Sequence, residues 1–185
     1  MTVTEEQYLV IDRAAEFRHE LLDGEIVALP GGNIRHAQLR MNLIGELHAR
    51  VRATHCKIFG CDLRVRVSPR MYTYPDLNIV CGSPAVADER QDILLNPTVI
   101  FEVLSPSTEH YDRGLKFRRY REIESLTDYI LVDQDQTRIE QFTRGDANTW
   151  TLHDYQRTDE VLRIASIGIS VPLSGIYEGI EFLSE

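Results

Sequence analysis

The clearest structural signal in the chain is Thr98-Val99-Ile100-Phe101-Glu102-Val103-Leu104-Ser105-Pro106-Ser107-Thr108. Its apolar part is typical of a strand that is buried on both faces of a sheet. One charged residue, Glu102, interrupts that part. A carboxylate among apolar side chains costs free energy unless it is paired or holds a metal, and burial alone would raise its pKa. The stretch therefore predicts a central strand that carries a functional glutamate.

Two neighbouring segments supply charged groups that can complement Glu102. The run 76–81 is a second apolar strand, and Asp76 begins it. The segment 108–123 is predicted to be helical, and at 100° per residue Lys116 falls inside its apolar arc. Two carboxylates with a lysine nearby are the minimum for metal-assisted hydrolysis of a phosphodiester. The alternatives are a lysine that reaches out from the edge of the core and a solvated aspartate in a turn.

The remaining pattern predicts an α/β or α+β domain with a mixed sheet and helices against it. Helices are expected over 4–15, with Thr4 as N-cap, and over 35–54, where apolar residues recur with a 3.6-residue period. Asp23-Gly24 predicts a hairpin turn. Further strands are expected at 56–60, 62–68, 128–133, 138–143, 149–155 and 160–164, a loop at 82–97, and a mixed tail at 170–185.

Composition limits the class of protein. The net charge of −9 is unfavourable for indiscriminate binding to nucleic acid, although a local basic cleft is compatible with it. The 185 residues, of which 43% are hydrophobic, suit one soluble globular domain. No apolar run approaches the roughly 20 residues that span a bilayer, and we expect no signal peptide. Cys56, Cys61 and Cys81 form no C-x-x-C pair and are expected to be reduced thiols of a cytoplasmic protein.

Two further side chains are weaker candidates for a site. His36 lies on the apolar face of its helix, where a lone histidine is more often a core residue than a ligand. Glu20 lies in a strand, and periodicity does not fix which face it occupies. The sequence contains no G-x-G-x-x-G, Walker A, G-x-S-x-G or zincin-type histidine motif, which leaves the carboxylates and the lysine as the main candidates.

The chain resembles the Uma-type restriction endonucleases, a branch of the PD-(D/E)XK nuclease superfamily. The resemblance covers roughly residues 17 to 145. The matching pieces are His19–Glu25, the helix from His36, Tyr74-Pro75-Asp76, Phe101–Thr108, Asp112, Lys116–Tyr120 and Asp128–Asp133. The superfamily pattern would place a lysine two residues after the acidic position, where this chain has Leu104. The family looks like one in which the lysine has migrated to the next helix, where Lys116 would supply it.

The resemblance implies a restriction endonuclease-like fold with an α-β-β-β-α-β core and extra strands in 146–185, all within one domain of residues 1–185. Asp76 and Glu102, with the carbonyl of Val103, would bind Mg²⁺, for which Mn²⁺ can substitute. Lys116 would hold or activate the attacking water and stabilise charge on the phosphate. The last two candidates are Glu20, as an additional catalytic carboxylate, and His36, as an accessory neighbour.

The implied activity is endonucleolytic hydrolysis of DNA, with duplex DNA as the expected partner and a homodimer as the expected assembly. A first alternative is a catalytically silent module of the same fold that binds nucleic acid or a protein. Leu104 and the net charge favour that alternative, whereas the retained trio Asp76, Glu102 and Lys116 favours the nuclease. A second alternative is a structural dimer with a buried ion pair between Glu102 and Lys116, which would contribute little net stability.

Overall fold

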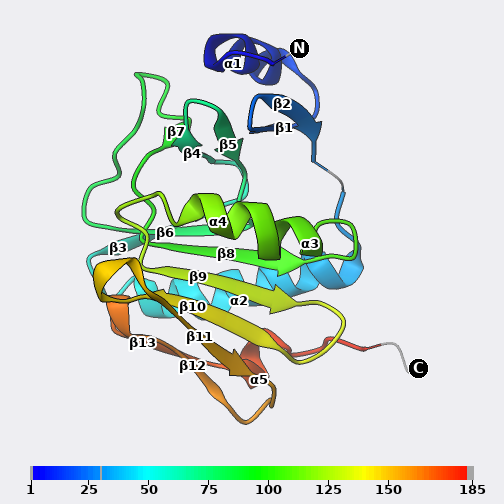
Figure 1. Cartoon of the computed structure of the whole chain (residues 1–185). Helices are drawn as coiled ribbons and strands as arrows, with labels where there is room; N and C mark the ends of the chain where they lie inside the picture. Colours follow the sequence, from blue (N-terminus) through cyan, green and yellow to red (C-terminus); the bar gives the residue numbers. More distant parts are fainter. Residues whose placement is uncertain (1, 30, 183–185) are drawn as a thin grey trace.

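The computed structural model describes residues 2–29 and 31–182, and its centre is a six-stranded mixed sheet (Figure 1). The strands run in the order β11-β10-β9-β8-β6-β3. Their bounds are β3 Cys56–Gly60, β6 Leu77–Cys81, β8 Val99–Leu104, β9 Asp128–Asp133, β10 Ile139–Arg144 and β11 Trp150–Tyr155. Strands β3, β6 and β8 are antiparallel neighbours, while β8 and β9 are parallel. A parallel pair requires a crossover connection, which the helical segment between β8 and β9 supplies.

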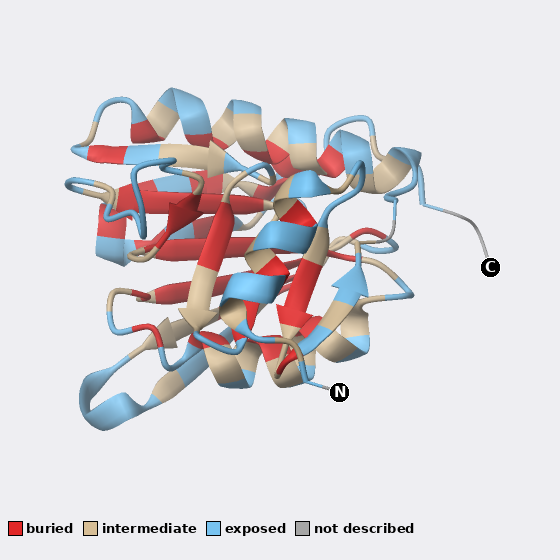
Figure 2. Ribbon diagram, turned by 90° about the horizontal axis from the view of Figure 1, so that it is seen from above, coloured by how far each residue is buried: buried red, intermediate tan, exposed pale blue. Residues whose placement is uncertain are grey.

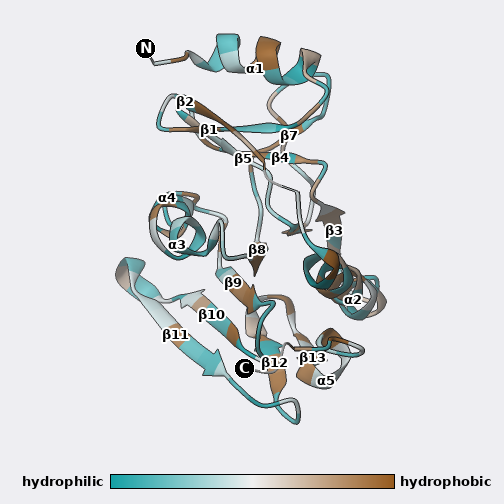
Figure 3. Ribbon diagram, turned by 90° about the vertical axis from the view of Figure 1, so that its right-hand side faces the viewer, coloured by the Kyte–Doolittle hydropathy of each residue, from teal (hydrophilic) through white to brown (hydrophobic). Residues whose placement is uncertain are grey.

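Helices cover both faces of this sheet (Figure 3). On one face lies α2 (Ile34–Val51), whose fully buried leucines Leu39, Leu43 and Leu47 pack on the strands. On the other face lies one helical segment in three parts: α3 (Glu109–Tyr111), the π-helical η1 (Asp112–Lys116) and α4 (Phe117–Tyr120). The order α2, β3, β6, β8, α3–α4, β9 confirms the expected α-β-β-β-α-β core.

Strand β8 is buried along its whole length, as its sequence predicts, and Figure 2 shows the central strands in the colour of buried residues. Because side chains alternate along a strand, Phe101 and Val103 join the core under α2, whereas Ile100 and Leu104 join the core under α4. Glu102 has the same parity as Ile100 and Leu104, so it faces the helical segment that follows β8.

A second, five-stranded sheet and α1 (Glu5–Ala14) form another layer (Figure 3). Its strands, in sheet order, are β2 Glu25–Ala28, β1 His19–Leu22, β5 Met71–Thr73, β4 Arg64–Ser68 and β7 Ile93–Leu94. Thr4 caps α1 in a capping box with Gln7. Asp23 and Gly24 both have positive φ, 50° and 94°, which is the backbone that a two-residue hairpin turn requires. The predicted helix and hairpin are therefore confirmed.

Short elements account for the differences between prediction and structure. The expected loop at 82–97 contains β7, and the expected mixed tail contains most of β13 (Ile169–Pro172) and α5 (Leu173–Ile176). β13 pairs with β12 (Val161–Ile164), and α5 packs on α2. Strand β5, which has three residues, was also not predicted. β7 pairs with β4, and α5 packs on α2, and local patterns do not reveal partners this distant in the sequence. β5 and β13 pair with the strands just before them but have only three and four residues, which is too short for a clear periodic pattern.

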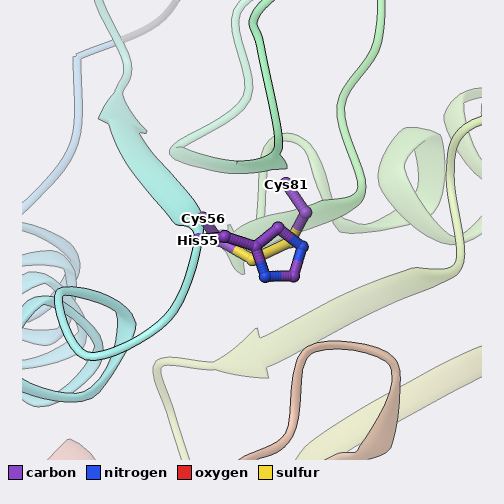
Figure 4. A group of neighbouring side chains, drawn as sticks. All are labelled: His55, Cys56 and Cys81. Carbon is purple, nitrogen blue, oxygen red and sulfur yellow. A yellow bond between two sulfur atoms is a disulfide. The ribbon is translucent and has the colours of Figure 1, made fainter.

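The prediction that all cysteines are reduced thiols is wrong for two of them, because Cys56 and Cys81 form a disulfide (Figure 4). The antiparallel register of β3 and β6 places these residues directly opposite each other, with their Cα atoms 3.9 Å apart. Cys61 has a free thiol. The prediction rested on the odd number of cysteines and on their spacing. The pairing depends on the register between β3 and β6, which cysteine spacing does not reveal.

Among the described residues, no helix is both long enough and apolar enough to cross a lipid bilayer.

Candidate active site

Asp76 and Glu102 meet where β6 begins and β8 approaches its end. Leu77 on β6 pairs with Phe101 on β8, and one further step in this antiparallel register brings Asp76 opposite Glu102. The amide of Asp76 donates to Oε2 of Glu102 at 3.4 Å, and the amide of Val103 donates to Oδ2 of Asp76 at 2.8 Å. Strand pairing thus fixes both carboxylates next to each other.

Lys116 reaches the same place from the π-helical turn. Its Nζ lies 3.0 Å from Oε1 of Glu102, 3.3 Å from Oε1 of Glu20 and 3.1 Å from Oδ1 of Asp112. The contact with Asp112 is an ion pair without hydrogen-bond geometry, since Oδ1 of Asp112 has no hydrogen-bond partner among the described residues. Lys116 is only 5% exposed. The lysine therefore lies inside the site and does not extend into solvent.

The crowded carboxylates determine the protonation state of the lysine. Burial disfavours the ammonium form, but the nearby Glu102 and Glu20 outweigh burial and hold the pKa of Lys116 well above its usual range. Burial raises the pKa of Glu102 as well, Lys116 opposes that rise, and Asp112 and Asp76 add to it. The cluster carries more buried acid than the single ammonium can neutralise.

Glu20 faces the site, which periodicity alone could not establish. It is 3% exposed, and its Oε1 accepts a hydrogen bond from the amide of Tyr74 at 2.9 Å. His36 lies at the rim, with Nε2 3.4 Å from Oδ2 of Asp76. The structure therefore brings together every residue that the sequence singled out for the site. These residues are Asp76, Glu102, Val103, Lys116, Glu20 and His36.

The site opens into a cleft of about 430 Å³. Asp76, Glu102, Val103 and Lys116 contribute to its wall, together with side chains of both charges. These further side chains are Glu16, Arg18, His36, Arg40 and Asp112. Arg18 and Arg40 place positive charge at the wall, beside the acidic side chains that also line it.

The donor set fits a hard divalent cation. Oδ1 of Asp76 has only Arg40 nearby, at 3.8 Å, and Oε2 of Glu102 accepts only the long bond from the Asp76 amide among the described residues. Each carboxylate therefore retains an oxygen that can act as a ligand. Mg²⁺ typically binds one or two carboxylates and keeps several waters, so Asp76 and Glu102 would hold it, with the Val103 carbonyl as a neighbouring backbone oxygen.

Three residues of the site did not stand out in the sequence as site candidates. Asp112 lies four residues before Lys116, and its Oδ1 is 3.1 Å from the lysine Nζ. The Tyr120 hydroxyl lies 3.1 Å from Oε1 of Glu102. Asp112, Lys116 and Tyr120 are spaced four apart, so the helical period could have grouped them. Arg40 follows His36 by the same interval and also approaches Asp76.

Leu104 occupies the position at which the superfamily pattern would place its lysine. Its side chain is 3% exposed and packs in the core beneath α4, on the same face of β8 as Glu102. A lysine side chain at position 104 would have to extend out of this apolar core to reach the carboxylates. Lys116 instead reaches Glu102 from the helical segment that covers the same face.

A mixed sheet between helices, with carboxylates from its central strands beside a lysine, defines the class of proteins with a restriction endonuclease-like fold. The Uma2 family, described as "Putative restriction endonuclease", matches residues 5–174, and this chain belongs to that family.

Two relatives come from Synechocystis sp. The "Uncharacterized protein slr1290" is 35% identical over 178 residues, which are 96% of this chain and 92% of the relative. The "Uncharacterized protein sll1609" is 32% identical over 81% of this chain and 85% of the relative.

A solved structure supports the fold. The crystal structure of "a putative nuclease belonging to DUF820" from Anabaena variabilis superposes with a TM-score of 0.78. The match covers 95% of this chain and 97% of that chain at 16% identity. Similarity at this level of identity establishes the shared fold.

Proposed function

We propose that this protein is a metal-dependent endonuclease that hydrolyses phosphodiester bonds in DNA. The observation that carries the proposal is the convergence of Asp76, Glu102 and Lys116 on one cleft, where Glu20 also contacts the ammonium group of Lys116. Membership of a family described as restriction endonucleases supports it. In this proposal the whole chain is one nuclease domain, and residues 146–185 extend its core.

The proposed cation is Mg²⁺, with Mn²⁺ as a substitute, and it would supply Lewis acidity and lower the pKa of a bound water. Asp76 and Glu102 would bind the cation through the carboxylate oxygens that other side chains leave available. Val103 would contribute its backbone carbonyl. The amide of Val103 fixes the rotamer of Asp76 through a 2.8 Å hydrogen bond, which keeps the ligand oxygens in place.

Lys116 stabilises the negative charge that develops on the phosphate as the water attacks. It is the migrated active-site lysine of this proposal, and its three carboxylate contacts keep it protonated. Glu20 holds one side of the ammonium group. His36 and Arg40, at the rim, lie where they can contact the phosphate backbone of a bound strand.

Duplex DNA as substrate, a homodimer as the active assembly and the cytoplasm as the location are parts of the same proposal. Cleavage of both strands of a duplex presents two scissile bonds, which a two-fold dimer can address with two sites. Arg18 and Arg40 of the cleft wall place positive charge where it can contact the phosphates of a bound strand.

One observation favours the second candidate, a silent module that binds nucleic acid or a protein. Lys116 contacts three carboxylates within 3.3 Å, which is also what a purely structural ion cluster would show. A direct assay of cleavage separates the two candidates.

The assay incubates supercoiled plasmid with purified protein and Mg²⁺ or Mn²⁺. Nicking or linearisation is expected from the wild type and is expected to be lost in Glu102→Gln and Lys116→Ala. The matched controls are Glu25→Gln and Lys57→Ala, which change exposed residues outside the cleft and should leave cleavage intact. Cleavage that persists in both site variants would contradict the proposal.

Binding of the cation is tested separately by calorimetry. Asp76→Asn removes a charge without changing volume, so we expect it to abolish Mg²⁺ binding while the circular dichroism spectrum stays that of the wild type. Unchanged Mg²⁺ affinity in this variant would remove Asp76 from the site, whatever the plasmid assay shows.

A further inference from the structure

A second group of potential ligands lies at the other end of β6. Asp76 precedes the first residue of β6, whereas Cys81 is its last residue. Five residues of extended strand separate the two positions by roughly 15 Å. Cys81 lies beside Cys56 of β3, and His55 immediately precedes that strand (Figure 4). Whatever this group binds is therefore separate from the candidate active site.

Backbone geometry explains why the two cysteine side chains are so close. The carbonyl of His55 accepts a hydrogen bond from the amide of Gly82, and the amide of Cys81 donates to Oγ1 of Thr98. The facing residues Cys56 and Cys81 therefore form a non-hydrogen-bonded antiparallel pair. In such pairs the side chains approach more closely than in hydrogen-bonded pairs.

His55 adds a nitrogen ligand to the two sulfurs. One imidazole nitrogen and both Sγ atoms lie within 4.8 Å of one another. His55 is exposed, Cys81 is half-buried, and Cys56 is 7% exposed. The imidazole makes no hydrogen bond or ion pair with another described side chain. The group is thus accessible from solvent on one side, and its histidine is free to act as a ligand.

We propose that reduction of the Cys56–Cys81 disulfide creates a zinc-binding site, with His55, Cys56 and Cys81 as ligands and a water in the fourth position. A dithiol reductant supplies two electrons and two protons, the S–S bond breaks to give two thiols, and the reductant becomes a disulfide. Binding of Zn²⁺ then displaces the two thiol protons to solvent, because the thiolate is the ligand.

The chemistry and the spacing both suit zinc. Zn²⁺ prefers cysteine sulfur and histidine nitrogen, at about 2.3 Å and about 2.0 Å. In tetrahedral coordination two such ligand atoms lie roughly 3.5–3.8 Å apart. The three ligand atoms already lie within 4.8 Å of one another, so rotation of the side chains after the S–S bond breaks can bring them to these separations. While the disulfide is intact, neither sulfur is a thiolate, so the oxidised protein lacks this site.

The bound zinc replaces the disulfide as a connection between β3 and β6. Strand β3 is at an edge of the six-stranded sheet, and within residues 2–29 and 31–182 its only strand partner is β6. A metal that binds the folded state stabilises it according to its concentration and affinity. In a reducing compartment the same three residues would then secure the edge strand.

The test titrates the reduced full-length protein with Co²⁺ as a spectroscopic substitute for Zn²⁺, in excess Mg²⁺. The expected result is charge-transfer absorption from thiolate to cobalt and visible bands of tetrahedral cobalt, at about one ion per chain, followed by their loss when Zn²⁺ displaces Co²⁺. Oxygen ligation at Asp76 and Glu102 gives no thiolate band, so the readout is specific to this site. The oxidised protein should show no such band.

Three variants assign the ligands. Cys56→Ser should abolish the thiolate band, whereas Cys61→Ser, the matched control, should retain it. His55→Ala changes an exposed residue and should weaken Co²⁺ affinity at least about tenfold, the loss that even an outer-shell substitution commonly causes. Failure of the reduced wild type to bind Co²⁺, or a thiolate band that persists in Cys56→Ser or is lost in Cys61→Ser, would overturn the proposal.

Discussion

Replacing Lys116 by methionine removes a buried charge and keeps most of the side-chain volume. Lys116 is 5% exposed, and its Nζ lies within 3.3 Å of carboxylate oxygens from Glu20, Glu102 and Asp112. These carboxylates are 4% exposed or less. In Lys116→Met they would face one another without a cation, or some of them would have to take up protons. Either outcome costs free energy in the folded state only.

The size of the effect follows from the burial of the ions. Removal of one member of a buried ion pair usually destabilises a protein by about 3–5 kcal/mol, because the partner charge remains in a medium of low polarity. We expect a loss in this range. For a chain of this length, 1 kcal/mol corresponds to about 2–4 °C in Tm, so the midpoint should fall by roughly 6–20 °C.

Urea denaturation at pH 7 with EDTA measures this loss. Lys57→Met, which changes an exposed lysine on β3, is the matched control and should stay within about 0.5 kcal/mol of the wild type. The double variant Glu102→Gln/Lys116→Met should lose less than the sum of the single variants by at least about 1 kcal/mol, since the two side chains are in contact. A loss below about 1 kcal/mol in Lys116→Met, or full additivity, would refute the buried ion cluster.

Two further predictions concern the stability of the fold. The Arg13 hydrogen bond, helped by Arg64 and opposed by burial, holds the pKa of Asp92 below its usual value of 3.8. The stabilisation that the ionised Asp92 carboxylate contributes is therefore complete above pH 3.8 and is lost as the pH falls below that value. The gap in unfolding free energy between wild type and Asp92→Asn should be constant from pH 7 to 5 and should shrink towards pH 2, and a gap that grows in acid would contradict this. Tyr120→Phe removes the hydroxyl beside Glu102 and should cost about 1.5–3 kcal/mol in urea denaturation, the usual value for a buried hydrogen bond to a charged group; a neutral effect would show that the hydroxyl is not engaged.

The carboxylates of the candidate site were predictable because strand burial is visible in sequence. An apolar run of strand length predicts a central strand, and any charge inside it needs an explanation. Glu102 is buried in β8, and Asp76 precedes β6, as that argument required. Glu20 could be proposed only from the resemblance, because the face of a short strand depends on its partners. The Asp12 and Arg64 ion pair, which links α1 to β4, was likewise invisible because its members are distant in sequence.

The placement of Lys116 was predicted for a reason that is only partly correct. The prediction assumed a regular helix over 108–123, whereas residues Asp112–Lys116 form a π turn. Hydrogen bonds in a π turn span one more residue than in an α-helix, so an angular position calculated at 100° per residue does not apply across it. Lys116 nevertheless lies on the buried face of this segment, where its Nζ is 3.0 Å from Oε1 of Glu102.

The π turn also connects the lysine to the aromatic core. The hydroxyl of Tyr129 on β9 donates to the carbonyl of Asp112 at 3.1 Å, and so takes up a backbone oxygen at the start of the turn. The ring of Phe117, the residue after the lysine, stacks on Tyr129 and contacts Phe142 with centroids 5.5 and 4.3 Å apart. Kinks and turns of this kind form where a side chain enters the hydrogen-bond ladder. A lysine on a strand is positioned by its own strand, whereas Lys116 depends on the packing of β9 and β10 against the helix. The C-terminal half of the sheet therefore acts on the candidate site through backbone geometry, without contributing a side chain to its carboxylates.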